Sequence, residues 1–243
     1  AYCWGNGTNG RLGNGAKDNQ FIPVQVSGRF SFASVNAGLT HTCGITNRGA
    51  AYCWGANNGG QLGHGDAAPY AEPVPVSGGL AFTSVSSGGF FTCGITADGG
   101  AYCWGSGSKG KLGNGSTDLR TRPVPVSGNL RFKVLSSNAH TCGITVEGAA
   151  HCWGNGGDGR LGNGSTEDQA RPVPVSGNLT FASLSAGRDH TCGITTEGAA
   201  YCWGKGGDGQ LGNGSESDSA TPVPVTGGLI FKSLSAGGDL FGG

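Results

Sequence analysis

The sequence of 243 residues has little charge and no methionine. Only 12% of its residues are charged, and 15 Lys and Arg balance 15 Asp and Glu. Without a basic excess the chain lacks the counterion release that drives nucleic-acid binding and the attraction of basic surfaces to anionic lipid. It also has no apolar run as long as a membrane-spanning segment. These absences argue against nucleic acid as a partner and against membrane insertion.

The sequence also lacks the short motifs that mark many enzyme and cofactor sites. It contains no P-loop, no H-E-x-x-H and no G-x-S-x-G between a strand and a helix. Zinc is disfavoured because no Cys-x-x-Cys occurs, and calcium because the alternating acidic ligands of a calcium loop are missing around Asp158 and Asp208. We therefore expect a non-catalytic protein with no cofactor and no metal.

Glycine is abundant, and it is arranged in a repeat. The 51 Gly and 10 Pro would indicate a disordered chain if they had no period. However, a Trp-Gly pair returns about every 50 residues, which is the mark of a repeat architecture. The five tryptophans of the repeat are Trp4, Trp54, Trp104, Trp153 and Trp203.

Each repeat predicts four short strands separated by glycine-rich turns, with no helix. After Trp-Gly come Leu-Gly-x-Gly, a polar loop, Pro-Val-x-Val, Phe-x-x-Val/Leu and Thr-Cys-Gly-Ile-Thr. A four-stranded unit of this size is typical of one β-propeller blade, whose Trp, Leu and Phe pack between blades. We predict an all-β protein, a single β-propeller domain over residues 1–243 made of five four-stranded blades. The repeats cover approximately 4–53, 54–103, 104–152, 153–202, and 203–243 plus 1–3.

The text W-G-x6-L-G-x-G, P-V-x-V, A-G-x-x-H-T resembles the repeat of the regulator of chromosome condensation family over essentially the whole chain. The resemblance implies a β-propeller that usually has seven blades. The chain is thus either a closed ring of five blades or a segment of a longer ring. Members of the family present loops to proteins, as exchange factors for small GTPases, chromatin binders or secreted β-lactamase inhibitors. Neutral charge and paired cysteines disfavour the first two roles.

Eight of the nine cysteines form pairs ten residues apart. The members of a pair lie on the two arms of one hairpin, where cross-strand neighbours can form a disulfide. Each bridge should contribute about 2–3 kcal/mol on the chain-entropy model, and such bridges persist in oxidising compartments. We therefore expect a secreted protein, extracellular or on the cell surface. The expected pairs are Cys43 with Cys53, Cys93 with Cys103, Cys142 with Cys152, and Cys192 with Cys202.

Cys3 is left unpaired, because Gly242 stands where a fifth partner would be. If the ring closes with five blades, the first strand joins the last blade beside Leu240 and Phe241. If the propeller is longer, further repeats would supply a partner for Cys3.

His41, His140 and His190 occupy the same position in three repeats, but Phe91 and Leu240 occupy it in the others. This interruption argues against a metal ring. We expect structural imidazoles that hydrogen-bond to turns, while His64 and His151 are expected to be tolerated surface or packing substitutions.

The loops that vary between repeats are the candidate binding surface, because a specific partner cannot be recognised by five identical surfaces. Aromatic side chains and arginines dominate interface energetics. A basic stretch follows Trp104 and would steer an acidic partner if it formed one patch. It contains a single acid, Asp118, against Lys109, Lys111, Arg120, Arg122, Arg131 and Lys133. The candidate binding residues are Leu39, Tyr70, Phe90, Arg120, Arg122 and Arg188.

The sequence therefore favours a protein-binding or adhesion module that acts through its loops. Low charge and the unpaired Cys3 also favour self-assembly, as the subunit of an extracellular fibre, sheath or surface layer. Loops rich in Trp, Tyr and Asn favour a third hypothesis, a carbohydrate-binding propeller with a glycan ligand.

Overall fold

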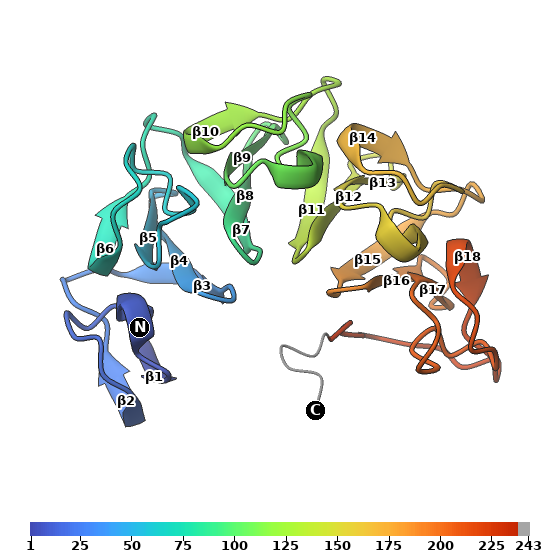
Figure 1. The fold of residues 1–243 in the computed structure, drawn as a ribbon, viewed down its shortest axis with the longest axis horizontal. Coiled ribbons are helices and arrows are strands. Elements are labelled where there is room, and N and C mark those ends of the chain that lie inside the picture. Colours follow the sequence, from blue (N-terminus) through green and yellow to red (C-terminus); the bar gives the residue numbers. More distant parts are fainter. Residues whose placement is uncertain (238–243) are drawn as a thin grey trace. The chain divides into compact units, whose positions relative to one another are not determined.

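The computed structural model describes residues 1–237 and is all-β apart from three short 3-10 helices (Figure 1). Its contacts divide the chain into two compact units. Unit 1 comprises residues 1–108 and 117–126, and unit 2 comprises residues 109–116 and the chain from 127 onward. No helix among the described residues has the length and apolar composition needed to cross a membrane.

Unit 1 contains one two-stranded and two four-stranded antiparallel sheets, ordered β1-β2, β3-β4-β5-β6 and β7-β8-β9-β10. Its strands are β1 (Tyr2–Gly5), β2 (Gln20–Gln25), β3 (Phe32–Ala37), β4 (His41–Thr46), β5 (Ala51–Gly55), β6 (Tyr70–Pro75), β7 (Phe82–Ser87), β8 (Phe91–Thr96), β9 (Ala101–Gly105) and β10 (Arg120–Pro125). The helix η1 (Thr8–Gly10) follows β1, and η2 (Ser108–Gly110) follows β9.

Unit 2 contains two further four-stranded antiparallel sheets, ordered β11-β12-β13-β14 and β15-β16-β17-β18. Its strands are β11 (Phe132–Ser137), β12 (His140–Thr145), β13 (Ala150–Gly154), β14 (Gln169–Pro174), β15 (Phe181–Ala186), β16 (His190–Thr195), β17 (Ala200–Gly204) and β18 (Ser219–Pro224). The helix η3 (Gly157–Gly159) follows β13.

The prediction of five four-stranded blades is met by four sheets, and within residues 1–237 the fifth sheet has only the two strands β1 and β2. Each four-stranded sheet starts at a Phe strand of one repeat and ends at the Pro-Val strand of the next repeat. The first Trp and Pro-Val strands of the chain, β1 and β2, are therefore left as a sheet of two strands. At the other end, Phe231 N donates to Gly198 O, but residues 231–237 pair with no strand in the described part of the chain. The predicted join beside Leu240 and Phe241 lies outside the described residues.

The two central strands of each four-stranded sheet are joined by a disulfide. Cys43 on β4 stands directly opposite Cys53 on β5, with their Cα atoms 4.0 Å apart, because the three-residue turn ending at Gly49 places them symmetrically. Gly49 has φ +81°, a left-handed conformation that glycine adopts without steric cost. The four bonded pairs are Cys43–Cys53, Cys93–Cys103, Cys142–Cys152 and Cys192–Cys202, and Cys3 is not in a disulfide.

Neighbouring sheets within a unit are held together by a tryptophan that packs on a glycine. Trp104 is fully buried, and a Cβ on Gly63 would lie 2.6 Å from its indole Cδ1. The indole Nε1 donates to Gln61 O at 2.9 Å, and Thr92 Oγ1 donates to the same carbonyl at 2.9 Å. One carbonyl in the loop of one sheet thus ties down two strands of the next, a packing typical of adjacent propeller blades.

The same arrangement recurs in unit 2. Trp203 Nε1 and Thr191 Oγ1 both donate to Arg160 O, at 3.0 and 2.9 Å, and Gly162 lies beneath the Trp203 ring. Trp153 Nε1 donates to Lys111 O at 3.0 Å and packs on Gly113. The prediction that the Trp series is buried is confirmed for four of the five tryptophans, whereas Trp4 is 62% exposed.

His41 and His140 are completely buried, and they bond to the adjacent sheet instead of to turns, which corrects the expectation above. His41 Nε2 lies 2.8 Å from Thr92 Oγ1, whose only proton goes to Gln61 O. Nε2 must therefore carry a proton, and Nδ1 is left as a buried acceptor without a partner. Burial lowers the pKa of His41 to about 3. His140 makes the equivalent bond to Thr191 at 2.6 Å, and burial, with charge repulsion from Arg160, lowers its pKa to about 3.

Substitution of two glycines in one loop tests the tryptophan packing. Gly162 and Gly164 both have positive φ, but only Gly162 lies under Trp203, whereas no atom lies within 4 Å of a Cβ on Gly164. We expect Gly164→Ala to lower the free energy of unfolding by about 1 kcal/mol through backbone strain alone. Gly162→Ala should lower the free energy of unfolding by about 1–3 kcal/mol more than Gly164→Ala does, because its methyl group displaces the indole of Trp203. Urea denaturation under non-reducing conditions measures both, and equal losses would contradict this packing.

The buried histidines predict a pH dependence of stability. Their folded-state pKa is about 3, whereas an unfolded histidine titrates near 6.5, so the unfolded chain binds more protons between these values. This contribution to stability is therefore fully present above about pH 6.5. As the pH decreases from 7 to 5, the free energy of unfolding decreases by about 1–2 kcal/mol per histidine. His41→Phe and His140→Phe, which copy Phe91 of the sister sheet, should each flatten this slope. An unchanged slope in both variants would contradict the assignment.

Candidate protein-binding loops

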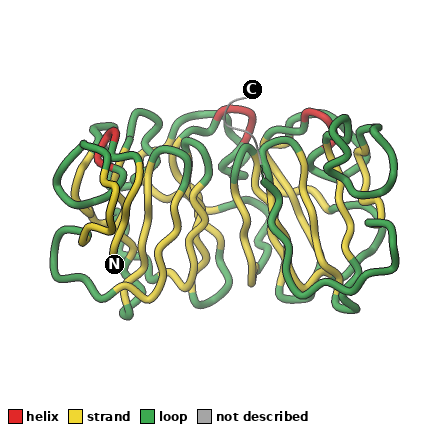
Figure 2. The backbone as a smooth tube through the Cα atoms, turned by 90° about the horizontal axis from the view of Figure 1, so that it is seen from below, coloured by secondary structure: helices red, strands yellow, loops and turns green. Residues whose placement is uncertain are grey.

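Two sets of loops lie at the same end of the four-stranded sheets. The corner loops join the first two strands of each sheet, and the long loops join the last two. They meet through backbone bonds: Ala56 N donates to Thr40 O, and Ser106 N donates to Phe90 O. Figure 2 shows the short helices of the long loops beyond the strand ends. The corner loops are residues 38–40, 88–90, 138–139 and 187–189, and the long loops between paired strands are 56–69, 106–119, 155–168 and 205–218.

The corner loops of unit 1 present apolar side chains. Leu39 is exposed at one corner and Phe90 at the next. The two corners touch, because Thr40 Oγ1 donates to Gly89 O at 3.2 Å. Arg11 Nη1 donates to Leu39 O at 3.0 Å and so holds the first corner from the loop that follows β1. The corner loops that carry Leu39 and Phe90 thus adjoin each other within unit 1.

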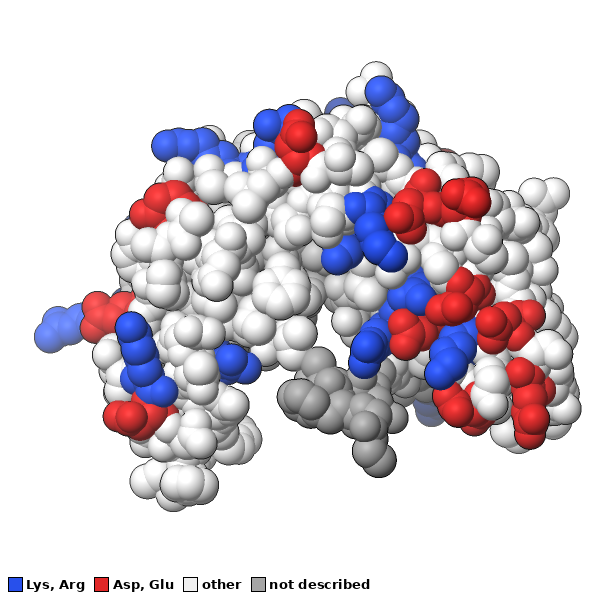
Figure 3. Space-filling view, in the orientation of Figure 1, with Lys and Arg blue, Asp and Glu red and all other residues white. Residues whose placement is uncertain are grey.

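The equivalent corner of unit 2 is charged. Arg160 is buried, and its guanidinium bonds Asp158 Oδ2 at 2.6 Å, Asp189 Oδ1 at 3.0 Å and Arg188 O at 2.6 Å. The Arg188 side chain is exposed, with its Nε 3.7 Å from Asp189 Oδ2. Charged side chains of both signs gather over η3 and the loop after β17 in Figure 3. A corner with the same backbone therefore offers a partner quite different chemistry.

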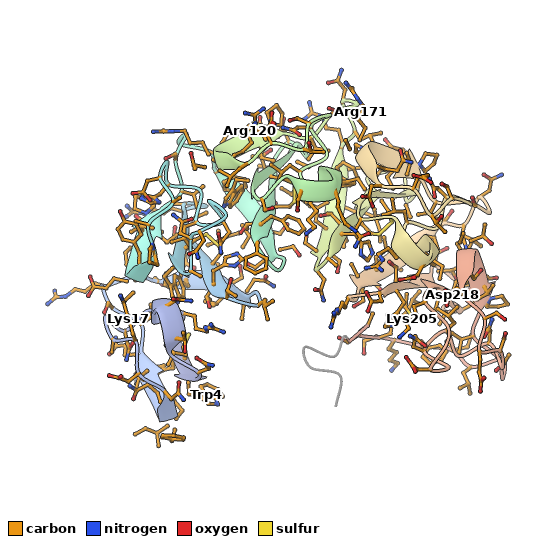
Figure 4. The ribbon with its side chains drawn as sticks, in the orientation of Figure 1. Trp4, Lys17, Arg120, Arg171, Lys205 and Asp218 are labelled. Carbon is orange, nitrogen blue, oxygen red and sulfur yellow. A yellow bond between two sulfur atoms is a disulfide. The ribbon has the colours of Figure 1, made fainter. Side chains whose placement is uncertain are left out.

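The long loop after β17 adds to this charged surface. Lys205 Nζ lies 2.9 Å from Asp208 Oδ2, and Asp218 lies in the same loop (Figure 4). The hydrogen bond to Asp208 raises the pKa of Lys205, and the same bond lowers the pKa of Asp208. Desolvation lowers the pKa of the half-buried His190 and outweighs the charge of Asp189, which acts to raise it. Both shifts favour the charged forms of Lys205 and Asp208, so this ion pair is present at neutral pH.

The remaining candidate residues lie on the outer strands, away from the corners. Tyr70 begins β6, and its hydroxyl donates to Asp66 Oδ2 at 3.0 Å. Asp66 also bonds His64 Nε2 at 3.0 Å, so His64 is part of a local packing cluster with the Tyr70 ring. Arg120 begins β10, and its Nη2 lies 3.3 Å from Asp118 Oδ2. Arg122 packs over Gly65 of the preceding long loop. The structure thus places Leu39, Phe90 and Arg188 in corner loops, and Tyr70, Arg120 and Arg122 on outer strands.

The basic residues after Trp104 do not form one patch. Lys109 and Lys111 lie in the long loop that follows β9, near η3, where Lys109 Nζ bonds Asn155 Oδ1 at 3.2 Å. Arg131 precedes β11, and its carbonyl accepts from Val146 N in the turn at the opposite end of the same unit. A single basic steering surface is therefore not formed in unit 2.

Sequence reasoning missed the residues that hold the corners in place. Arg11, Gln61 and Arg160 all stand just before the Leu of Leu-Gly-x-Gly, and the backbone carbonyl of Gln61 or Arg160 receives the Trp and Thr bonds. Their side chains reach the corner: Gln61 Nε2 lies 3.4 Å from Thr40 Oγ1, and Arg11 and Arg160 bond corner carbonyls. The available signal was a long polar side chain at this position in every repeat.

The glycan hypothesis loses most of its aromatic basis. Of the five tryptophans, Trp54, Trp104, Trp153 and Trp203 are completely buried, and only Trp4 is exposed.

No group of three His, Cys, Asp or Glu side chains within residues 1–237 is arranged to hold a metal ion.

Comparison with known proteins identifies the fold. The RCC1-like domain family matches residues 1–241. No curated protein matches the sequence. Human WBSCR16 aligns with 98% of this chain and 65% of its own, at 22% identity and a TM-score of 0.86. Prp20p from Saccharomyces cerevisiae aligns with 93% of this chain and 59% of its own, at 20% identity and a TM-score of 0.80.

A third similar structure is the ectodomain of the receptor kinase CR4 from Physcomitrella patens. It aligns with 88% of this chain and 47% of its own, at 24% identity and a TM-score of 0.57. The chain therefore spans less than two thirds of the length of each of these structures. With four antiparallel four-stranded sheets and a family match over residues 1–241, the chain belongs to the RCC1-like domain family of β-propellers.

Proposed function

We propose that the chain is a non-catalytic, extracellular or cell-surface module that binds a protein through its corner loops. The observation that carries this proposal is that similar contacts hold the corner loops, whereas the exposed side chains at the middle of these loops differ. The packing of Trp on Gly and the Thr-to-carbonyl bond recur below the three corners whose tips carry Leu39, Phe90 and Arg188. The indole hydrogen bond is present below Phe90 and Arg188 and absent below Leu39. A scaffold that fixes its loops and varies only their tips is suited to selective binding.

Protein binding is supported by a relative of the same fold. The structure of Prp20p was presented together with its binding properties to Gsp1p and histones. Those particular partners are not transferred to this chain, because its charge balance is neutral and eight of its nine cysteines are paired. Aromatic and arginine side chains such as Phe90 and Arg188 are the types that anchor protein interfaces.

The extracellular location is supported by the disulfides. Four bridges, one in each four-stranded sheet, are typical of an oxidising compartment. The CR4 structure is described as an ectodomain, so the fold is compatible with that environment. We further propose that the sheets are consecutive blades of one propeller, which has five blades if it closes within residues 1–243 and more if it continues.

The loop proposal is tested by cross-linking followed by affinity measurements. A photo-reactive p-benzoylphenylalanine at position 90 should capture a protein from the extracellular fraction of the source cells. The same group at position 146 is the control, because Val146 is exposed in the β12–β13 turn, at the end of its own sheet that is opposite that sheet's corner loop. The captured protein is then purified for titration calorimetry.

We expect Phe90→Ala to weaken binding of that protein at least about tenfold, as is usual for an aromatic anchor. Val146→Ala should change the affinity less than about twofold, in line with a surface substitution outside an interface. In the equivalent comparison for a charged residue, Arg188→Ala in a corner loop should weaken binding more than Arg48→Ala in the β4–β5 turn does. Weaker binding only in the Val146 or Arg48 variants would place the interface at these turns instead of at the corner loops and would overturn the proposal.

A further inference from the structure

A cavity of about 290 Å³ lies in unit 1, where the β4–β5 turn meets the loop between β6 and β7. This turn is at the end of the sheet opposite its corner loop. The loop is fixed to the turn at both of its ends, because Val76 N donates to Ala51 O and Phe82 N donates to Gly49 O. The cavity is thus enclosed by two segments that are bonded to each other. Its lining includes Arg48, Ala50, Tyr52, Gly79, Leu80 and Ala81.

The small side chain of Ala81 leaves space that larger residues fill in other sheets. Thr180 and Ile230 occupy the equivalent position, each just before the Phe of its repeat. A Cβ on the turn glycine would lie 2.6 Å from Thr180 Cγ2 in one sheet and 2.7 Å from Ile230 Cγ2 in another. Ala81 has only its Cβ beside the turn glycine Gly49, at 3.3 Å. The turn is therefore covered by a branched side chain in those sheets and left open here.

Gly79 removes a second side chain from the rim of the cavity. Asn129 and Asn178 stand at the equivalent position in two other repeats, with φ of +54° and +52°. Gly79 has φ +64°, and no atom lies within 4 Å of a Cβ built on it. The backbone is thus the same, and the difference lies in the missing side chain. The cavity is a local property of this sheet that results from two small residues.

The walls of the cavity are apolar and well supported. Val76 and Leu80 pack against the buried cluster that contains the Cys43–Cys53 disulfide. The ring of Tyr52 is held by Phe30, with their centroids 4.4 Å apart. An apolar, largely pre-formed cavity with few polar groups is typical of a small-molecule site, and this volume is near the lower end of the usual range. It suits a ligand with one aromatic ring or a short apolar chain.

Arg48 is the one charged residue that lines the cavity. The equivalent turn residues in the other sheets are acids that fold back on their own turns, as when Thr196 Oγ1 donates to Glu197 Oε1 at 2.9 Å. Arg48 has only donors, and it forms no ion pair with another residue in the described range 1–237. Its guanidinium is therefore available to a carboxylate, which it can bind through two parallel hydrogen bonds.

We propose that this cavity binds a small monocarboxylate with a single aromatic ring or a short apolar chain. The apolar part of the ligand lies against Tyr52, Leu80 and Ala81, and its carboxylate accepts hydrogen bonds from Arg48. The turn acids Asp98, Glu147 and Glu197 would repel such a ligand in the other sheets. This site uses no residue of the corner loops, so it is independent of the proposed protein-binding function.

The proposal is tested by fluorine NMR titration of the unsubstituted chain with two probes of similar shape. One is 4-fluorophenylacetate, and the other is the neutral 2-(4-fluorophenyl)ethanol. We expect a dissociation constant of about 1–5 mM or lower for the acid, in line with the affinity of ligands of this size. The alcohol should bind at least about tenfold more weakly, because it lacks the charged hydrogen bonds. Equal affinities, or no saturable binding of the acid up to about 20 mM, would overturn the proposal.

Filling the cavity tests its position. Ala81→Ile copies Ile230 of an otherwise identical Gly-Gly-Leu loop and should weaken binding of the acid at least about tenfold. Ile230→Ala is the matched control and should change the affinity less than about twofold. Gly79→Asn, which copies Asn178, gives a second variant with the expected loss if Ala81→Ile does not fold. Unchanged binding in a folded variant of either kind would place the probe elsewhere and refute the site.

Reversing the charge at Arg48 tests the contact with the carboxylate. Arg48→Glu copies Glu197 and should weaken binding of the acid at least about tenfold, while the alcohol changes less than about twofold. Lys17→Glu makes the same change in net charge at an exposed residue that does not line the cavity, so it should leave both affinities within about twofold. Equal losses for acid and alcohol in Arg48→Glu, or equal losses of the acid in Arg48→Glu and Lys17→Glu, would contradict recognition of the carboxylate by Arg48.

Discussion

The structure depends on a tryptophan ring lying flat on a glycine of the preceding repeat. This contact leaves no room for a side chain, as the 2.6 Å approach of a Cβ on Gly63 to Trp104 shows. It also brings the indole N–H to the carbonyl of Gln61, which the Thr92 hydroxyl shares. The loop that contains Gln61 and Gly63 thus makes both the packing contact and the hydrogen bonds with the next sheet. These contacts fix the position of neighbouring sheets within a unit. A chain with so few large apolar residues gains its core from this repetition together with the four disulfides.

The same placement explains how the molecule separates stability from recognition. The residue that offers the shared carbonyl extends its own side chain to the corner loop, as Arg160 does toward Arg188 O and Asp189. The corners are thereby fixed, while their tips differ: apolar at Leu39 and Phe90, charged at Arg188. A tip can change without disturbing the contact between sheets. This division of roles underlies the proposed binding function.

The repeat predicted the strand content, the cross-strand position of the cysteines and the burial of four of the five tryptophans, because these follow from local spacing. It did not predict where sheets begin, since the exchange of strands between repeats depends on packing: β1 and β2 carry a full repeat signature but form only half a sheet. The bond from His41 to Thr92 joins residues 51 apart and has no local signal. The six candidate residues were dispersed because variability alone does not distinguish a corner from an outer strand, as Tyr70 and Arg122 illustrate.

The most direct test of this account is the hydrogen exchange of the individual indole N–H groups, measured by NMR under native conditions. The account predicts that the indole protons of Trp104, Trp153 and Trp203 exchange only when the sheets separate, because each is buried and bonded to a carbonyl of the preceding loop. The exposed Trp4 should exchange as fast as in a short peptide. Rapid exchange of all these indoles alike would contradict the claim that the tryptophan contact holds neighbouring sheets together.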